Sequence, residues 1–169
     1  MSIKVLAGLV LGALGLAVWL PSASVEAQTS ESPTAKRPAV VKKSAAKTKV
    51  NKVAIQVSEN DKNVMNRALN NTRNLIAFYK AKGEKVNVEI VTFHDGLHLL
   101  RSESPVKDRI AVMALENPEV TFVACANTQA NQSKAEGKAV TLLSEAKVMP
   151  SGIARLIELQ QQGYTYIRP

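Results

Sequence analysis

Short β-branched or apolar runs alternate with helical patterns along residues 53–169, and this alternation is the strongest constraint on the fold. The strand-like runs are "VAIQV" (53–57), "VNVEIVTF" (86–93), "EVTFVACA" (119–126), "KVMP" (147–150) and "YTYIRP" (164–169). Strands that alternate with helices indicate a mostly parallel sheet with helices on its faces. The sequence therefore predicts an α/β domain, in which the loops after the carboxyl ends of the strands form the functional rim.

The most regular helical pattern lies in residues 58–83, where apolar side chains recur with helical spacing. Ser58 and Asp61 are suited to cap its start, and Gly83 is suited to end it. Shorter helices are predicted within 94–104, 105–118 and 151–163. Residues 127–146 are polar and lack apolar periodicity, so this segment is predicted to be irregular, with one helical turn at 139–143.

The first 27 residues resemble a targeting segment rather than part of the domain. Lys4 precedes an apolar run over residues 5–20, and small residues follow up to Ala27. This run is shorter than the roughly 20 residues that span a bilayer comfortably. The pattern predicts a secretory signal peptide over residues 1–27 and export, with the periplasm as the expected destination. An uncleaved anchor through residues 5–20 is the alternative.

The positive charge of the chain is concentrated before the domain. The net charge is +8, yet residues 53–169 hold 14 basic and 12 acidic side chains, whereas residues 26–52 hold seven basic and two acidic ones. A nucleic-acid footprint would lie on a domain face, so the distribution argues against a nucleic-acid partner. Residues 28–51, rich in Lys, Ala, Ser and Pro, are predicted to be a flexible linker. Membrane contact is expected only through this basic segment or an uncleaved anchor.

Cys125 is the only cysteine, so an internal disulfide is excluded. It stands at the end of the third predicted strand, where polar residues resume. Free cysteines are often small buried core residues, but an unpaired thiol in an oxidising compartment is a candidate reactive group. Both interpretations stay open on position alone.

Four motifs, in order, resemble the DsrE-like family of sulfur-relay proteins. They are "ALNNTRNLIAFY" (68–79), "VEIVTFHDGLHLL" (88–100), "FVACANT" (122–128) and "VMPSGIARLIELQQQGYTYIRP" (148–169). The resemblance spans residues 52–169, the whole predicted domain. It implies a three-layer α/β/α fold with a five-stranded parallel sheet in the order 4-3-2-1-5, and assembly as a trimer or as two stacked trimers. It also implies that Cys125 carries sulfur as a persulfide.

With that strand order, Cys125 would have His94 and Asp95 on one side and Ser151 and Gly152 on the other. Backbone N–H groups at the Ser151-Gly152 turn and the positive end of a helix dipole would favour a thiolate. His94 would act as a base or a hydrogen-bond donor to the sulfur. Asn127 and, after it, Thr128 are further candidates, although such side chains can simply bond local backbone.

The sequence thus predicts an exported sulfur carrier, of the sulfurtransferase type if it turns over, with Cys125 as the reactive group. Donors and acceptors would be proteins or small sulfur compounds, and neither a cofactor nor a metal is expected, since no His or Cys residues stand at metal-ligand spacing. One alternative is a non-enzymatic oligomeric module that binds a small ligand or a protein and in which Cys125 is structural. Another is a redox sensor that forms an intermolecular disulfide.

Overall fold

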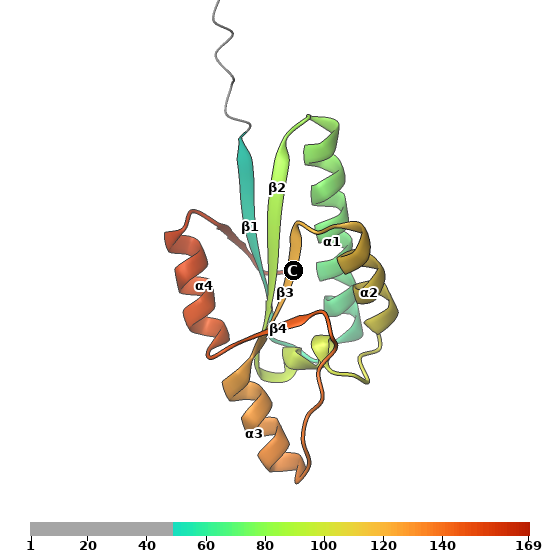
Figure 1. The fold of residues 1–169 in the computed structure, drawn as a ribbon, viewed down its shortest axis with the longest axis vertical. Helices are drawn as coiled ribbons and strands as arrows, with labels where there is room; N and C mark the ends of the chain where they lie inside the picture. Colours follow the sequence, from blue (N-terminus) through green and yellow to red (C-terminus); the bar gives the residue numbers. More distant parts are fainter. Residues whose placement is uncertain (1–48) are drawn as a thin grey trace, which may run out of the picture. The chain divides into compact units, whose positions relative to one another are not determined.

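A computed structural model describes residues 49–169, which form a single parallel sheet with helices on both faces (Figure 1). The strands are β1 (Val50–Val57), β2 (Lys85–Thr92), β3 (Val120–Cys125), β4 (Ala146–Met149) and β5 (Thr165–Ile167). The helices are α1 (Lys62–Ala81), the 3-10 helix η1 (His94–Leu100), α2 (Lys107–Glu116), α3 (Ala126–Glu136) and α4 (Gly152–Gln161). The strand order is β4-β3-β2-β1-β5, so the predicted α/β/α fold and its order are confirmed.

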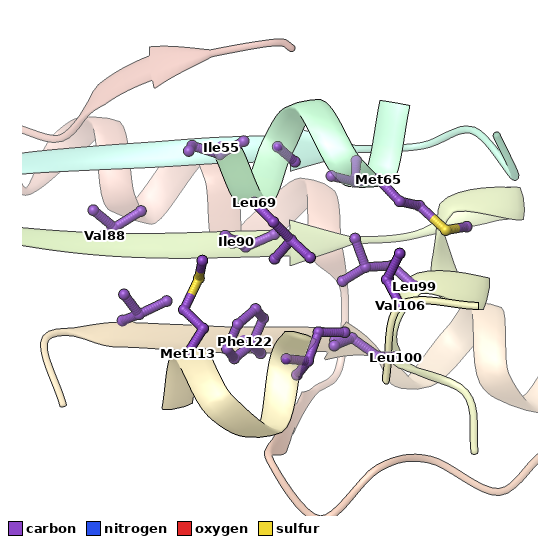
Figure 2. Close-up of a cluster of buried hydrophobic side chains, with 14 of the residues drawn as sticks. Ile55, Met65, Leu69, Val88, Ile90, Leu99, Leu100, Val106, Met113 and Phe122 are labelled. Carbon is purple, nitrogen blue, oxygen red and sulfur yellow. The ribbon is translucent and has the colours of Figure 1, made fainter. Parts of the chain in front are cut away.

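The larger core lies between the sheet and the helices α1 and α2 (Figures 1 and 2). Ile55, Ile90 and Phe122 are register partners on neighbouring strands, and each is at most 1% exposed. Met65 and Leu69 from α1 cover them, as Figure 2 shows. Continuous apolar runs in the central strands are the pattern expected of a parallel sheet buried on both faces.

The opposite face carries a smaller core beneath α4 alone. Its buried members are Ala54, Val91, Phe93, Val123, Cys125, Leu156 and Leu159. Cys125 therefore belongs to the α4 side of the sheet. The end of β3 lies close to the start of α4, because Cys125 pairs with Met149, three residues before α4 begins.

The long first helix begins at a side-chain cap, as predicted, although only one of the two expected residues forms it. Asp61 Oδ1 accepts hydrogen bonds from the N–H groups of Asn63, at 2.6 Å, and Val64, at 3.2 Å. Ser58 instead accepts a hydrogen bond from the Gln56 side chain. The helix ends before Gly83, whose φ of +68° suits glycine.

The prediction for residues 127–146 was wrong, because Ala126–Glu136 form α3. None of the residues of α3 is buried, so the helix has no apolar stripe that a periodicity argument could detect. The predicted helical turn at 139–143 is also absent, and this segment is extended. There Leu142 forms an antiparallel bridge with Arg101.

The domain starts slightly earlier than the predicted boundary at residue 52. β1 begins at Val50, so Val50 and Asn51, assigned above to the linker, pair with Lys85 and Val86 of β2. Polar side chains at the start of β1 interrupt the apolar pattern from which the strand was predicted. One of them, Asn51, donates from Nδ2 to Glu84 Oε2 at 2.8 Å. The predicted signal peptide and the rest of the linker lie outside the described residues. Within residues 49–169, no helix is both long and apolar enough to cross a membrane.

Gly96 allows η1 to lie directly on the end of β1, and its replacement offers a test of this packing. A Cβ at this position would lie 2.2 Å from the Val57 carbonyl oxygen. We expect Gly96→Ala to lower the free energy of unfolding by about 2 kcal/mol or more, because backbone must shift to relieve the overlap. Gly83→Ala is the matched control: no atom lies within 4 Å, so only the positive φ is penalised, by about 1 kcal/mol. Urea unfolding measures both, and equal losses would contradict the close approach at Gly96.

Candidate functional site

Cys125 lies where β3 ends and α3 begins. It is the last residue of β3 and the residue that immediately precedes the first turn of α3. Its strand partner is Met149, the last residue of β4, so the chain turns into α4 directly beside it. Cys125 is 5% exposed, and the apolar side chains that cluster with it include Phe93 and Val123. The thiol is thus nearly enclosed at the functional rim of the sheet.

The turn between β4 and α4 closes on the sulfur. Cys125 Sγ lies 4.0 Å from the Pro150 carbonyl oxygen, to which the neutral thiol can donate, and the Asn127 N–H also donates to that oxygen at 3.3 Å. Ser151 caps α4 by accepting from the Ala154 N–H at 3.3 Å. A Cβ at Gly152 would lie 2.9 Å from Phe93 Cδ1, so glycine permits the turn to approach β2 and the thiol.

The N-termini of α3 and α4 therefore both face Cys125, and they change its acidity. Burial acts to raise the pKa of the thiol, but hydrogen bonds oppose it, first from the Thr128 hydroxyl and then from the N–H groups of Gly152, Thr128 and Asn127. The net result is a pKa below the ordinary cysteine value. N–H groups in the first turn of a helix favour an anion, which explains the direction.

His94 reaches the site through its backbone. Its N–H donates to Thr128 Oγ1 at 3.2 Å, and its φ of +48° lies in the left-handed region, which is uncommon for a residue with a side chain. The imidazole packs edge-on against the Phe93 ring, with the ring centroids 5.7 Å apart. Among residues 49–169, the imidazole makes no hydrogen bond. The structure therefore shows a backbone donor where the sequence predicted a side-chain base or donor.

The other predicted neighbours contribute unequally. Gly152 lies at the thiol through its N–H, Ser151 caps α4 just before it, and Asn127 contributes its N–H while its side chain is exposed. Asp95 is exposed and lines a hollow of about 270 Å³ beside Thr128 rather than the sulfur itself. The rest of that lining comprises His94, Asn131, Gln132 and Ala135. Within residues 49–169, no three His, Cys, Asp or Glu side chains are placed to hold a metal ion.

Thr128 is the site residue that sequence reasoning ranked too low, below Asn127. It stands three residues after Cys125, and in a helix this position brings its N–H and hydroxyl back toward the residue before the first turn. The signal was therefore present in the spacing. It could be read only if Ala126–Glu136 were recognised as a helix, which its polar composition concealed.

The lowered thiol pKa predicts a pH-dependent contribution to stability. Between the folded-state pKa and the unfolded value of about 8.5, the unfolded chain binds a proton that the folded chain does not, so stability rises with pH. We expect the stability difference between wild type and Cys125→Ser to grow across that window, by about 1.4 kcal/mol per pKa unit of difference. It should be lost as pH falls through the folded-state pKa. Urea unfolding of both proteins over this pH range measures it, and a flat difference would show that the thiolate is not favoured.

The solved structures include one with the same domain. It is described as "Structure of Protein of Unknown Function MTH1491 from Methanobacterium thermoautotrophicum", and it superposes with a TM-score of 0.59 at 31% sequence identity. The match covers 70% of this chain and 99% of that chain. No family model and no curated protein matches the sequence. Identity at this level over the whole of the other chain shows that this chain belongs to the same family as MTH1491, a protein of unknown function.

Proposed function

We propose that this protein is a DsrE-like sulfur carrier that takes up sulfane sulfur as a persulfide on Cys125 and passes it on. The observation that carries the proposal is that the nearly enclosed Cys125 thiol stands at the N-termini of both α3 and α4, whose donors lower its pKa. Sulfur transfer needs the thiolate, since the thiolate and not the thiol is the nucleophile. An inert core cysteine would have no need of donors that favour its anion.

The transfer step needs no group other than the donor. The Cys125 thiolate attacks the outer sulfur of a persulfide R–S–SH, a new S–S bond forms, and the old S–S bond breaks to release R–S⁻. With thiosulfate, the same attack leaves the persulfide anion on Cys125 and releases sulfite. The persulfide sulfur also carries negative charge, so the N–H groups that favour the thiolate favour the product as well.

Burial of Cys125 favours a small donor. The residue is 5% exposed, with the Pro150 carbonyl 4.0 Å from its sulfur. A polysulfide or thiosulfate ion needs only a narrow approach to Sγ. A protein donor would require the Pro150–Gly152 turn or the start of α3 to move.

The same burial supports a second candidate function, a non-enzymatic binding module in which Cys125 is structural. Cys125 packs in the smaller core with Val91 and Val123, as a small apolar residue would. In that case, native protein would resist thiol reagents until it is denatured. A sulfur carrier should instead react in the native state.

We further propose export to the periplasm, and assembly as a trimer or as two stacked trimers. Ile153 and Ile157 on α4 support self-association, since each is 51% exposed and one helical turn separates them. Multi-angle light scattering of the purified protein gives the oligomeric mass. A monomer at all concentrations would contradict the assembly, without bearing on the chemistry of Cys125.

The sulfur-carrier proposal predicts a mass gain on one residue. After incubation with polysulfide or thiosulfate and removal of excess donor, intact mass spectrometry should show wild-type protein heavier by one or more sulfur atoms. Cyanide or dithiothreitol should remove the added mass. Cys125→Ser should show no gain, since a serine hydroxyl does not attack sulfane sulfur under these conditions.

Two controls separate the candidates. A native Cys125 that reacts with iodoacetamide but gains no sulfur from any donor would favour a reactive thiol of another kind. A Cys125 that gains no sulfur and is alkylated only in urea would overturn the sulfur carrier in favour of the binding module.

A further inference from the structure

α3 lies at the site but has no apolar anchor. None of its residues, Ala126–Glu136, is buried, and Figure 1 shows it extending away from the sheet beyond the carboxyl ends of the strands. Its first turn nevertheless supplies the Thr128 hydroxyl and two of the N–H groups that face Cys125. Polar contacts must therefore determine how α3 is oriented.

The strongest of these contacts come from Arg101, a buried cation just after η1. Arg101 is 5% exposed. Its Nη1 and Nη2 donate to the two oxygens of the Glu136 carboxylate, at 2.5 and 2.9 Å. Its Nε lies 2.5 Å from Glu103 Oε1, in an ion pair without hydrogen-bond geometry. Arg101 Nη1 also donates to Gln132 Oε1 at 3.3 Å. One buried arginine thus contacts both the middle and the end of α3.

A continuous set of hydrogen bonds leads from this arginine to Thr128, whose hydroxyl lowers the pKa of the Cys125 thiol. Gln132 Nε2 donates to the His94 carbonyl oxygen at 3.1 Å, and the His94 N–H donates to Thr128 Oγ1 at 3.2 Å. The Thr128 hydroxyl faces Cys125. We refer to Arg101, Gln132, the His94 backbone and Thr128 as the Arg101 network.

We infer that Arg101 is a positioning residue for Cys125: through the Arg101 network it holds α3 and directs the Thr128 hydroxyl at the sulfur. This inference rests on the reactive-thiol part of the proposed function. Because Thr128 Oγ1 accepts from the His94 N–H, its own proton is free to point at the thiolate. The left-handed φ of His94 is unfavourable for a residue with a side chain, and the bonds on either side of its backbone hold it there.

Stability alone is a weak reason to bury this arginine. Burial removes the hydration of the guanidinium, whereas its partners Glu103 and Glu136 stay exposed to solvent, so these ion pairs contribute little to stability. A guanidinium, unlike an ammonium, is planar, and it can donate two hydrogen bonds to one carboxylate and a further one to a second group. That geometry suits an element whose direction matters.

The test compares the thiol pKa among variants, measured from the pH dependence of iodoacetamide alkylation of the native full chain. We expect Arg101→Lys and Gln132→Leu to move the alkylation midpoint upward, and to slow alkylation at neutral pH several-fold. Thr128→Val should have the largest effect, whereas Thr128→Ser should restore the wild-type midpoint. The double variant Arg101→Lys with Gln132→Leu should shift the midpoint by less than the sum of the single shifts, because both act through one network.

Arg109→Gln is the matched control, since Arg109 bonds Asn66 and Asn70 on α1 and no member of the network. Its midpoint should equal that of wild type. Circular dichroism and urea unfolding check that each variant is folded. If Arg101→Lys does not fold, Gln132→Leu, on the partly exposed surface of α3, decides the question.

A wild-type midpoint for both Arg101→Lys and Gln132→Leu, in folded protein, would overturn the positioning role while leaving the reactive thiol intact. A wild-type protein that is not alkylated in its native state would instead overturn the proposed function itself. The two failures are therefore distinguishable.

Discussion

The in-register parallel pairing of β3 with β2 and β4 is the constraint on which the rest of the structure depends. Val88 pairs with Val120, Thr92 with Ala124, and Cys125 with Met149. All three strands consequently end at the same edge, where the turns into η1, α3 and α4 meet. A register shift of one residue would exchange the two faces of β3 and turn Cys125 away from α4. The strand register thus determines which residues meet at the site.

Two different kinds of interaction hold the two helices whose N-termini face the thiol. α4 lies on the sheet through Leu156 and Leu159, and Arg155 fixes it further by a bidentate bond to the buried Glu89, at 2.6 and 2.9 Å. The Glu89 carboxylate raises the pKa of Arg155. α3 has no buried residue, and it is held by polar contacts, from Arg101 to Glu136 and Gln132 and from the Val140 backbone to Gln129 and Ser133. One helix is therefore held by packing and a salt bridge, and the other by polar contacts alone.

The donors at the two helix N-termini explain how a nearly enclosed cysteine can favour its thiolate. Apolar contacts with Phe93 and Val123 exclude water from the sulfur, and on their own they would raise its pKa. Amide N–H groups from two helices and the Thr128 hydroxyl supply the opposing effect. A site of this kind combines a dry environment with fixed donors, so an anion is stabilised by groups that need not reorganise.

Much of the fold followed from local sequence pattern, because apolar periodicity reports burial directly. The strands, α1, α2 and α4 were predictable, and so was the position of Cys125 at the end of β3. α3 was not predictable, since none of its residues is buried and the segment therefore shows no apolar periodicity. From the sequence pattern alone it follows that one thiol stands at a strand end, and the family resemblance placed a Ser-Gly turn beside it. That His94 acts through its backbone and that Arg101 contacts α3 follow only from the packed fold. The contacts of His94 and Arg101 with α3 join residues more than 30 positions apart, and polar contacts of this range depend on how the sheet and its loops are packed rather than on any local preference.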